Sequence, residues 1–109
     1  MLHASSQISL KLPLFEGPLD LLLHLVRQNR VEITDIPIAL ITDQYLQYLR
    51  LMEQMNLEIA SEFLIMASTL IEIKSRTLLP KPPKPQEEEE AEDPRAELAA
   101  RLEEYSRYK

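Results

Sequence analysis

The sequence predicts a mainly α fold: a small bundle of three helices with a short N-terminal β-strand, then an acidic, proline-rich linker and a partial fourth helix. Three observations predict it. Apolar residues recur every three or four positions from Leu19 to Leu78. A period-two pattern occupies a short segment near the N-terminus. Composition changes abruptly after Pro80. We therefore divide the 109 residues into a helical domain at 1–80, a flexible linker at 81–93 and a helical segment at 94–109.

The first predicted element is a strand over Ile8–Leu14, where apolar and polar residues alternate. Pro13 cannot donate a ladder hydrogen bond, so it places the strand at an edge or ends it. A lone strand leaves its backbone groups unpaired. We therefore expect it to pair either with the short run Val31–Ile33 or with a partner protein.

The first predicted helix runs from Pro18 to about Gln28. Proline favours the first helical position, and Asp20 adds an acid to the first turn. Gly17, the only glycine of the chain, precedes it. The apolar stripe of this helix is Leu19, Leu22, Leu23 and Val26.

The second predicted helix begins near Pro37, with Thr34 or Asp35 placed to cap it. Its stripe is spaced alternately by three and four residues and consists of Ile38, Ile41, Tyr45, Tyr48, Met52 and Met55. We expect the first helix to act as a scaffold that holds the second and third helices in register.

The third predicted helix spans Leu57–Leu79, with Asn56 as its cap, and carries two adjacent apolar seams. The first seam consists of Leu57, Ala60, Leu64, Ala67, Ile71, Lys74 and Leu78. The second seam consists of Ile59, Phe63, Met66, Leu70, Ile73 and Thr77. Two short helices can cover only about one side of a helix about 30 Å long. The other seam should then face a partner.

Three arrangements remain open for this helix: a tight bundle that buries both seams, self-association through an exposed seam, and docking of a helix from a different protein. We favour the third arrangement and an outward-facing first seam. Its small residues Ala60 and Ala67 let another helix approach, whereas Phe63 and Met66 suit a domain's own core. The predicted contact has Leu64, Ala67 and Ile71 at its centre, flanked by Ala60, Lys74 and Leu78.

The linker holds three prolines between Lys81 and Pro85 and six acids between Glu87 and Asp93. Such a segment should be extended, solvated and self-repelling. A final helix is predicted to begin at Pro94 with Asp93 as its cap. Its apolar stripe is Leu98, Leu102 and Tyr105.

Composition excludes several classes of function. Net charge is −6, and neither half offers the basic face that binding to DNA requires. Without cysteine the chain has no disulfide or thiolate metal site. His3 and His24 belong to no metal-ligand pattern, and one glycine cannot build a phosphate-binding loop. No signal peptide or membrane span is visible. We expect a soluble intracellular protein without catalytic residues, metal or cofactor.

The segment Phe15–Leu25 reads FEGPLDLLLHL, and it closely resembles the opening signature of the bacterial ScpA family, the kleisins of SMC condensin complexes. The resemblance covers Leu10 to Lys109. It continues, in order, through Asp35–Pro37, Gln44–Leu46, Phe63–Ala67, Ile73–Pro80, Asp93–Arg95 and Tyr105–Lys109.

The resemblance implies a non-catalytic role in chromosome condensation and segregation, in the cytoplasm and at the nucleoid. In this family the N-terminal helical domain packs on the neck coiled coil beside one SMC head, and SMC hydrolyses the ATP. A central region binds a dimer of ScpB, and a C-terminal winged helix binds the other head. Family chains continue past Lys109, so 94–109 would be the truncated start of the ScpB-binding region. We expect this chain to correspond to the N-terminal part.

Overall fold

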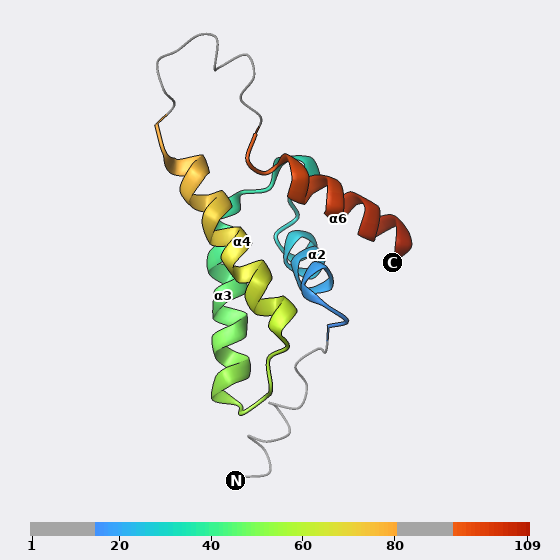
Figure 1. Ribbon diagram of the computed structural model, residues 1–109. Helices are drawn as coiled ribbons and strands as arrows, with labels where there is room; N and C mark the ends of the chain where they lie inside the picture. The colour runs from blue at the N-terminus through green and yellow to red at the C-terminus, as the bar shows by residue number, and fades with distance from the viewer. Residues whose placement is uncertain (1–14, 81–92) are drawn as a thin grey trace.

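The computed structural model describes residues 15–80 and 93–109. Four α-helices and one 3₁₀-helix make up this part of the chain: α2 (Pro18–Gln28), η1 (Ile33–Asp35), α3 (Ile38–Gln54), α4 (Ser61–Leu78) and α6 (Ala96–Tyr108) (Figure 1). The predicted mainly α fold is confirmed. The strand predicted at Ile8–Leu14 lies outside the described residues.

Helix α2 has the bounds that its sequence predicts, because Pro18 supplies a preset φ where no helical N–H bond is needed. The carbonyl of Gly17 accepts bonds from the N–H groups of Asp20 and Leu21 at 3.1 and 3.2 Å. The buried face is wider than the predicted stripe and includes Leu21 and Leu25. This width follows from packing, since α2 contacts α3, α4 and α6.

Helix α3 has no side-chain cap, so the capping roles predicted for Thr34 and Asp35 are wrong. Asp35 instead belongs to η1, which precedes the extended residue Ile36. The predicted apolar stripe faces the core from Ile38 to Met52, with Tyr45 near its centre, whereas Met55 is not part of the cluster. The hydroxyl of Tyr45 donates a buried hydrogen bond of 2.8 Å to the carbonyl of Phe63, and burial raises the pKa of this phenol.

Asn56 ends α3 rather than capping the next helix. Its φ is 60°, and its N–H bonds to the carbonyl of Glu53 while that of Leu57 bonds to the carbonyl of Met52. This pair of bonds is a Schellman motif, for which asparagine is a common alternative to glycine. Helix α4 consequently begins at Ser61, four residues later than predicted, and Ala60 stands at its N-cap position.

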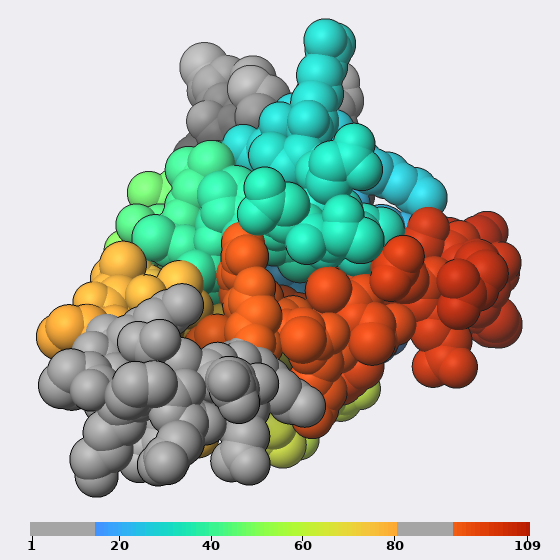
Figure 2. Space-filling view, turned by 90° about the horizontal axis from the view of Figure 1, so that it is seen from above, coloured from blue at the N-terminus to red at the C-terminus, as the bar shows by residue number. Residues whose placement is uncertain are grey.

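Helix α6 packs on α2 and η1, so the bundle is completed by four helices and not by three. Figure 1 shows α6 lying across α2, and Figure 2 shows its side chains seated against the segment around η1. The helix begins at Ala96, after a turn in which Asp93 accepts a 2.9 Å bond from the N–H of Arg95. Asp93 therefore caps the turn before α6 and not a helix beginning at Pro94.

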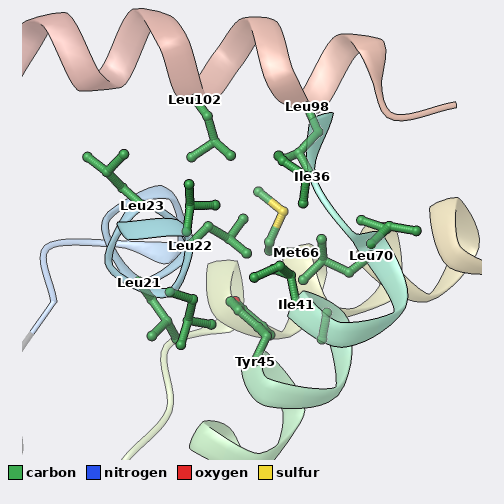
Figure 3. Packing of buried hydrophobic residues seen from close by; sticks show 14 of the residues in the cluster. Leu21, Leu22, Leu23, Ile36, Ile41, Tyr45, Met66, Leu70, Leu98 and Leu102 are labelled. Carbon is green, nitrogen blue, oxygen red and sulfur yellow. The ribbon is translucent and has the colours of Figure 1, made fainter. Parts of the chain in front are cut away.

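One hydrophobic cluster joins all four helices. Leu102 points from α6 toward Leu22 and Leu23 of α2, while Leu98 lies beside Ile36 (Figure 3). Met66 of α4 lies at the middle of the cluster. The core thus buries one side of α4 against the neighbouring helices, whereas another side of α4 keeps large apolar side chains exposed.

Candidate partner-docking surface

The inner side of α4 is the second predicted seam. Phe63, Met66, Leu70 and Ile73 are all buried in the hydrophobic cluster, and Ile59 packs against it in part. Thr77 is exposed and bonds back to the carbonyl of Ile73 at 2.8 Å. The prediction that this seam forms the core is therefore confirmed as far as Ile73.

The first predicted seam divides into two rows. A step of three residues leaves two side chains about 60° apart around the helix axis, and a step of four leaves them about 40° apart in the other direction. One row holds Ala67 and Lys74. Ala67 is only 8% exposed, and Lys74 Nζ lies 3.1 Å from Asp43 Oδ1 of α3. This row therefore faces the chain's own α3, and the small side chain of Ala67 allows the two helices to approach.

The other row faces outward. Leu64, Ile71 and Leu78 follow one another at seven-residue intervals and are 51%, 50% and 66% exposed. Seven residues are almost two helical turns, so these side chains form a nearly straight apolar line about 21 Å long. Scattered exposed leucines are ordinary in proteins, but a line at heptad spacing is the pattern of a coiled-coil seam. We call Leu64, Ile71 and Leu78 the outer row.

Three serines accompany the outer row. Ser61, Ser68 and Ser75 also repeat at seven residues and are exposed, about 40° around the helix from the leucine line. Small side chains at this place leave room for a helix to lie close to α4, because interaxial distance depends on the side chains at the contact. The outer row and the serines together form a flat, narrow strip suited to another helix.

The six predicted contact residues are thus separated by the structure. Leu64, Ile71 and Leu78 lie together on the strip, and Ala60 is exposed at its N-terminal end. Ala67 and Lys74 lie on the flank toward α3. Sequence reasoning missed the serines, whose shared period of seven was the available signal. It also missed Ile65, which is 66% exposed but lies about 100° from Leu64 around the helix.

The titratable side chains of the described residues are dispersed over the helices. Residues 15–80 and 93–109 contain no cluster of three or more histidines and acids that could hold a metal. His24 is half-buried, and its ring packs 5.2 Å from that of Phe15. A shallow hollow between α2 and α3 is lined chiefly by amide side chains such as Asn29 and Gln44, which bond to each other. No described helix is long and apolar enough to cross a membrane.

The family model described as "Segregation and condensation protein ScpA" matches residues 25–109. The chain belongs to the ScpA family. The match includes the whole of α3, α4 and α6, so the outer row, its flank toward α3 and the docked helix α6 all lie in the part of the chain that matches the family.

Relatives named Segregation and condensation protein A are similar over nearly the whole chain. The protein of Caldanaerobacter subterraneus is 53% identical over 102 residues, which are 93% of this chain and 41% of the relative. That of Halalkalibacterium halodurans is 57% identical over 104 residues, 93% and 40% respectively. That of Coxiella burnetii is 59% identical over 95 residues, 87% and 35%. The chain thus spans about two fifths of the length of these ScpA relatives.

Proposed function

We propose that this chain is the part of a kleisin that docks on the neck coiled coil of an SMC protein, and that the outer row of α4 makes the contact. The names of its relatives refer to segregation and condensation, which places the proposed role in chromosome organisation. The docking is non-enzymatic and would occur in the cytoplasm at the nucleoid. The single observation that carries the proposal is the exposed heptad line of Leu64, Ile71 and Leu78.

Physical reasoning supports a helix as the occupant of this strip. A coiled-coil neck presents knobs at intervals of 3.5 residues, which match a straight row at seven-residue spacing. Burying the exposed part of each outer-row side chain would contribute roughly 1 kcal/mol. An amphipathic helix on an apolar strip is also a common recognition mode. The ion pair of Lys74 with Asp43 lies beside the row and joins α4 to α3, and an exposed pair of this kind contributes only about 0–1 kcal/mol.

The test is size-exclusion chromatography with light scattering on a mixture of the chain and a purified SMC head that carries its neck. Co-elution at one-to-one mass is expected. Leu64→Lys should abolish the complex while circular dichroism shows an unchanged helical content, because Leu64 is half-exposed. Ile65→Lys is the matched control: it places the same charge on the same helix, away from the outer row, and should leave the complex intact.

Each contrary result has a definite meaning. If both variants bind like the parent chain, the outer row is not the docking surface. If the parent chain does not bind and its mass rises with concentration, the chain self-associates, and loss of that rise in Leu64→Lys would assign the self-association to the outer row. If Leu64→Lys unfolds the chain, Leu64 belongs to the core and the assignment of the rows is wrong.

A second part of the proposal concerns residues 94–109. By resemblance to the family, they begin the region that binds a ScpB dimer, and the described part of that region is α6 with its preceding turn. In the structure α6 is packed against α2 and η1, and this packing bears on how ScpB could reach it.

A further inference from the structure

Helix α6 is held on the rest of the bundle by polar contacts at both of its ends. At the N-terminal end, Arg95 Nη1 lies 3.0 Å from Asp35 Oδ1 and donates a 2.8 Å bond to the carbonyl of Ile36. At the C-terminal end, the Lys109 ammonium lies 2.7 Å from Asp20 Oδ1. One turn earlier, the hydroxyl of Tyr105 donates a 3.0 Å bond to Glu16 Oε1.

The charges in this clamp have one arrangement throughout. The two cations are the residues directly before and after α6, and the carboxylates that they meet across the contact belong to η1 and α2. Arg95 also pairs with Asp93 of its own segment at 2.7 Å, and the acceptor for Tyr105 is Glu16. Arg95 and Lys109 are fourteen residues apart, about 21 Å along a helix. The receiving surface is therefore an apolar strip with carboxylates at both ends, at the spacing of one short helix.

Between the two ends, Leu98 and Leu102 are buried against α2 and Ile36 (Figure 3). With the half-buried Tyr105, they form the whole apolar stripe of α6. The residues beside and opposite this stripe include Glu97, Arg101, Glu104 and Arg107, all exposed. Docking on α2 therefore uses the leucines of α6 and Tyr105, whereas Tyr108 at the end of the helix stays 80% exposed.

We propose that α6 exchanges between two receiving surfaces: the strip on α2 and η1, and an equivalent strip on the ScpB dimer. The inference rests on the assignment of 94–109 to ScpB binding. In this exchange ScpB takes up Leu98 and Leu102, the same leucines that docking buries, so that one contact excludes the other. ScpB binding then requires α6 to leave the bundle.

Exclusion has a measurable consequence. When only the undocked form binds, the apparent Kd equals the intrinsic Kd divided by the undocked fraction. Any change on the receiving side that weakens docking should therefore tighten ScpB binding, although the substituted residue never touches ScpB. A substitution within the apolar stripe of α6 itself removes contacts to ScpB and should therefore weaken ScpB binding.

The experiment is a calorimetric titration of the chain with purified ScpB dimer. Glu16→Ala and Asp35→Ala each remove one carboxylate from the receiving side, and both residues are exposed. Each variant should bind about two- to fivefold more tightly than the parent, the range for one exposed charged contact. The double variant should combine the two factors. Amide exchange at Leu98 and Leu102 should become faster in the same variants.

Asp43→Ala is the matched control, because it also removes an aspartate from an exposed ion pair but one that does not involve α6. It should leave both the Kd and the exchange of α6 unchanged. Faster exchange with an unchanged or weaker Kd would overturn the inference, as would a parent chain that does not bind ScpB. Either failure leaves the SMC docking test unaffected, since that test depends on α4.

Discussion

The ammonium of Lys109 lies 2.7 Å from the carboxylate of Asp20, joining the residue after α6 to the first turn of α2. Burial by itself would raise the pKa of Asp20. The bonds from Lys109 and from the N–H of Glu16 outweigh burial, so the pKa of Asp20 lies below its ordinary value. The bond to Asp20 conversely raises the pKa of Lys109. The ionised pair is therefore a feature of the folded state.

This pair predicts a loss of stability in acid. A carboxyl group whose pKa is lowered by folding stabilises the protein fully above its unfolded pKa, about 3.9, and loses that contribution as pH falls through the folded pKa. The free energy of unfolding should then decline below about pH 4. Urea titrations followed by circular dichroism at several pH values measure the decline. Asp20→Asn removes the ionisable group, so its decline should be shallower; an identical slope would contradict the assignment.

Arg30 predicts a stabilising substitution. It follows Asn29, the C-cap residue of α2, and has a φ of 55°. This left-handed conformation costs a residue with a Cβ about 1–2 kcal/mol. Glycine adopts it freely but loses more entropy on folding. Arg30→Gly should therefore raise the free energy of unfolding by about 0.5–1 kcal/mol. Arg27→Gly is the control: the same exchange inside α2 should destabilise by about 1 kcal/mol, as measured by urea denaturation.

Thr42 predicts a second stabilising substitution. Its side chain is fully buried in α3, and its Oγ1 has no hydrogen-bond partner among the described residues. An unsatisfied buried hydroxyl costs about 1–3 kcal/mol. Valine has nearly the same shape without the hydroxyl, so Thr42→Val should raise the unfolding free energy by about 1 kcal/mol.

Thr69→Val provides the comparison for Thr42, because Thr69 Oγ1 bonds to the carbonyl of Ile65 at 3.2 Å near the surface. That substitution should change stability by less than about 0.5 kcal/mol. Urea denaturation measures the unfolding free energy of both variants. If it showed that Thr42→Val is destabilising, the hydroxyl of Thr42 would have a hydrogen-bond partner in solution.

Local signals predicted some boundaries well. Pro18 and the charge pattern fixed α2, because proline at a first turn acts through its own backbone. The start of α4 was misplaced because Asn56 suits both a helix N-cap and a left-handed helix end. Only the contacts of Glu53 and Met52 with the following N–H groups distinguish the two. That information is in the backbone path and not in the residue type.

The candidate surface was predicted only in part, because the residue types of one helix do not specify which neighbour each of its faces meets. Periodicity identifies rows on a helix but not the neighbour that each row meets, which depends on crossing geometry. Leu64 and Ala67 therefore looked equivalent in sequence, although Ala67 is buried and Leu64 is half-exposed. The stripe of α6 was likewise correct, whereas its position on α2 and η1 is a tertiary contact without a local signal.

The serines of α4 provide a further test of docking. Ser68 is exposed at the middle of the serine row, and a long charged side chain there should hold a partner helix away from Leu64 and Ile71. Ser68→Arg should weaken SMC binding at least about tenfold, equivalent to 1.4 kcal/mol, without altering thermal unfolding by more than a few degrees.

Glu62→Arg places the same side chain on α4, about 120° from Ser68 around the helix, at another exposed position. A calorimetric titration with the SMC head and its neck measures the SMC affinity of both variants, and that of Glu62→Arg should match the parent chain. Equal weakening by both variants would indicate that general charge, and not the close approach of a helix over the serine row, governs binding. Weakening by Ser68→Arg alone would locate the partner helix over the outer row and the serines, because only there does side-chain length limit the distance between helices.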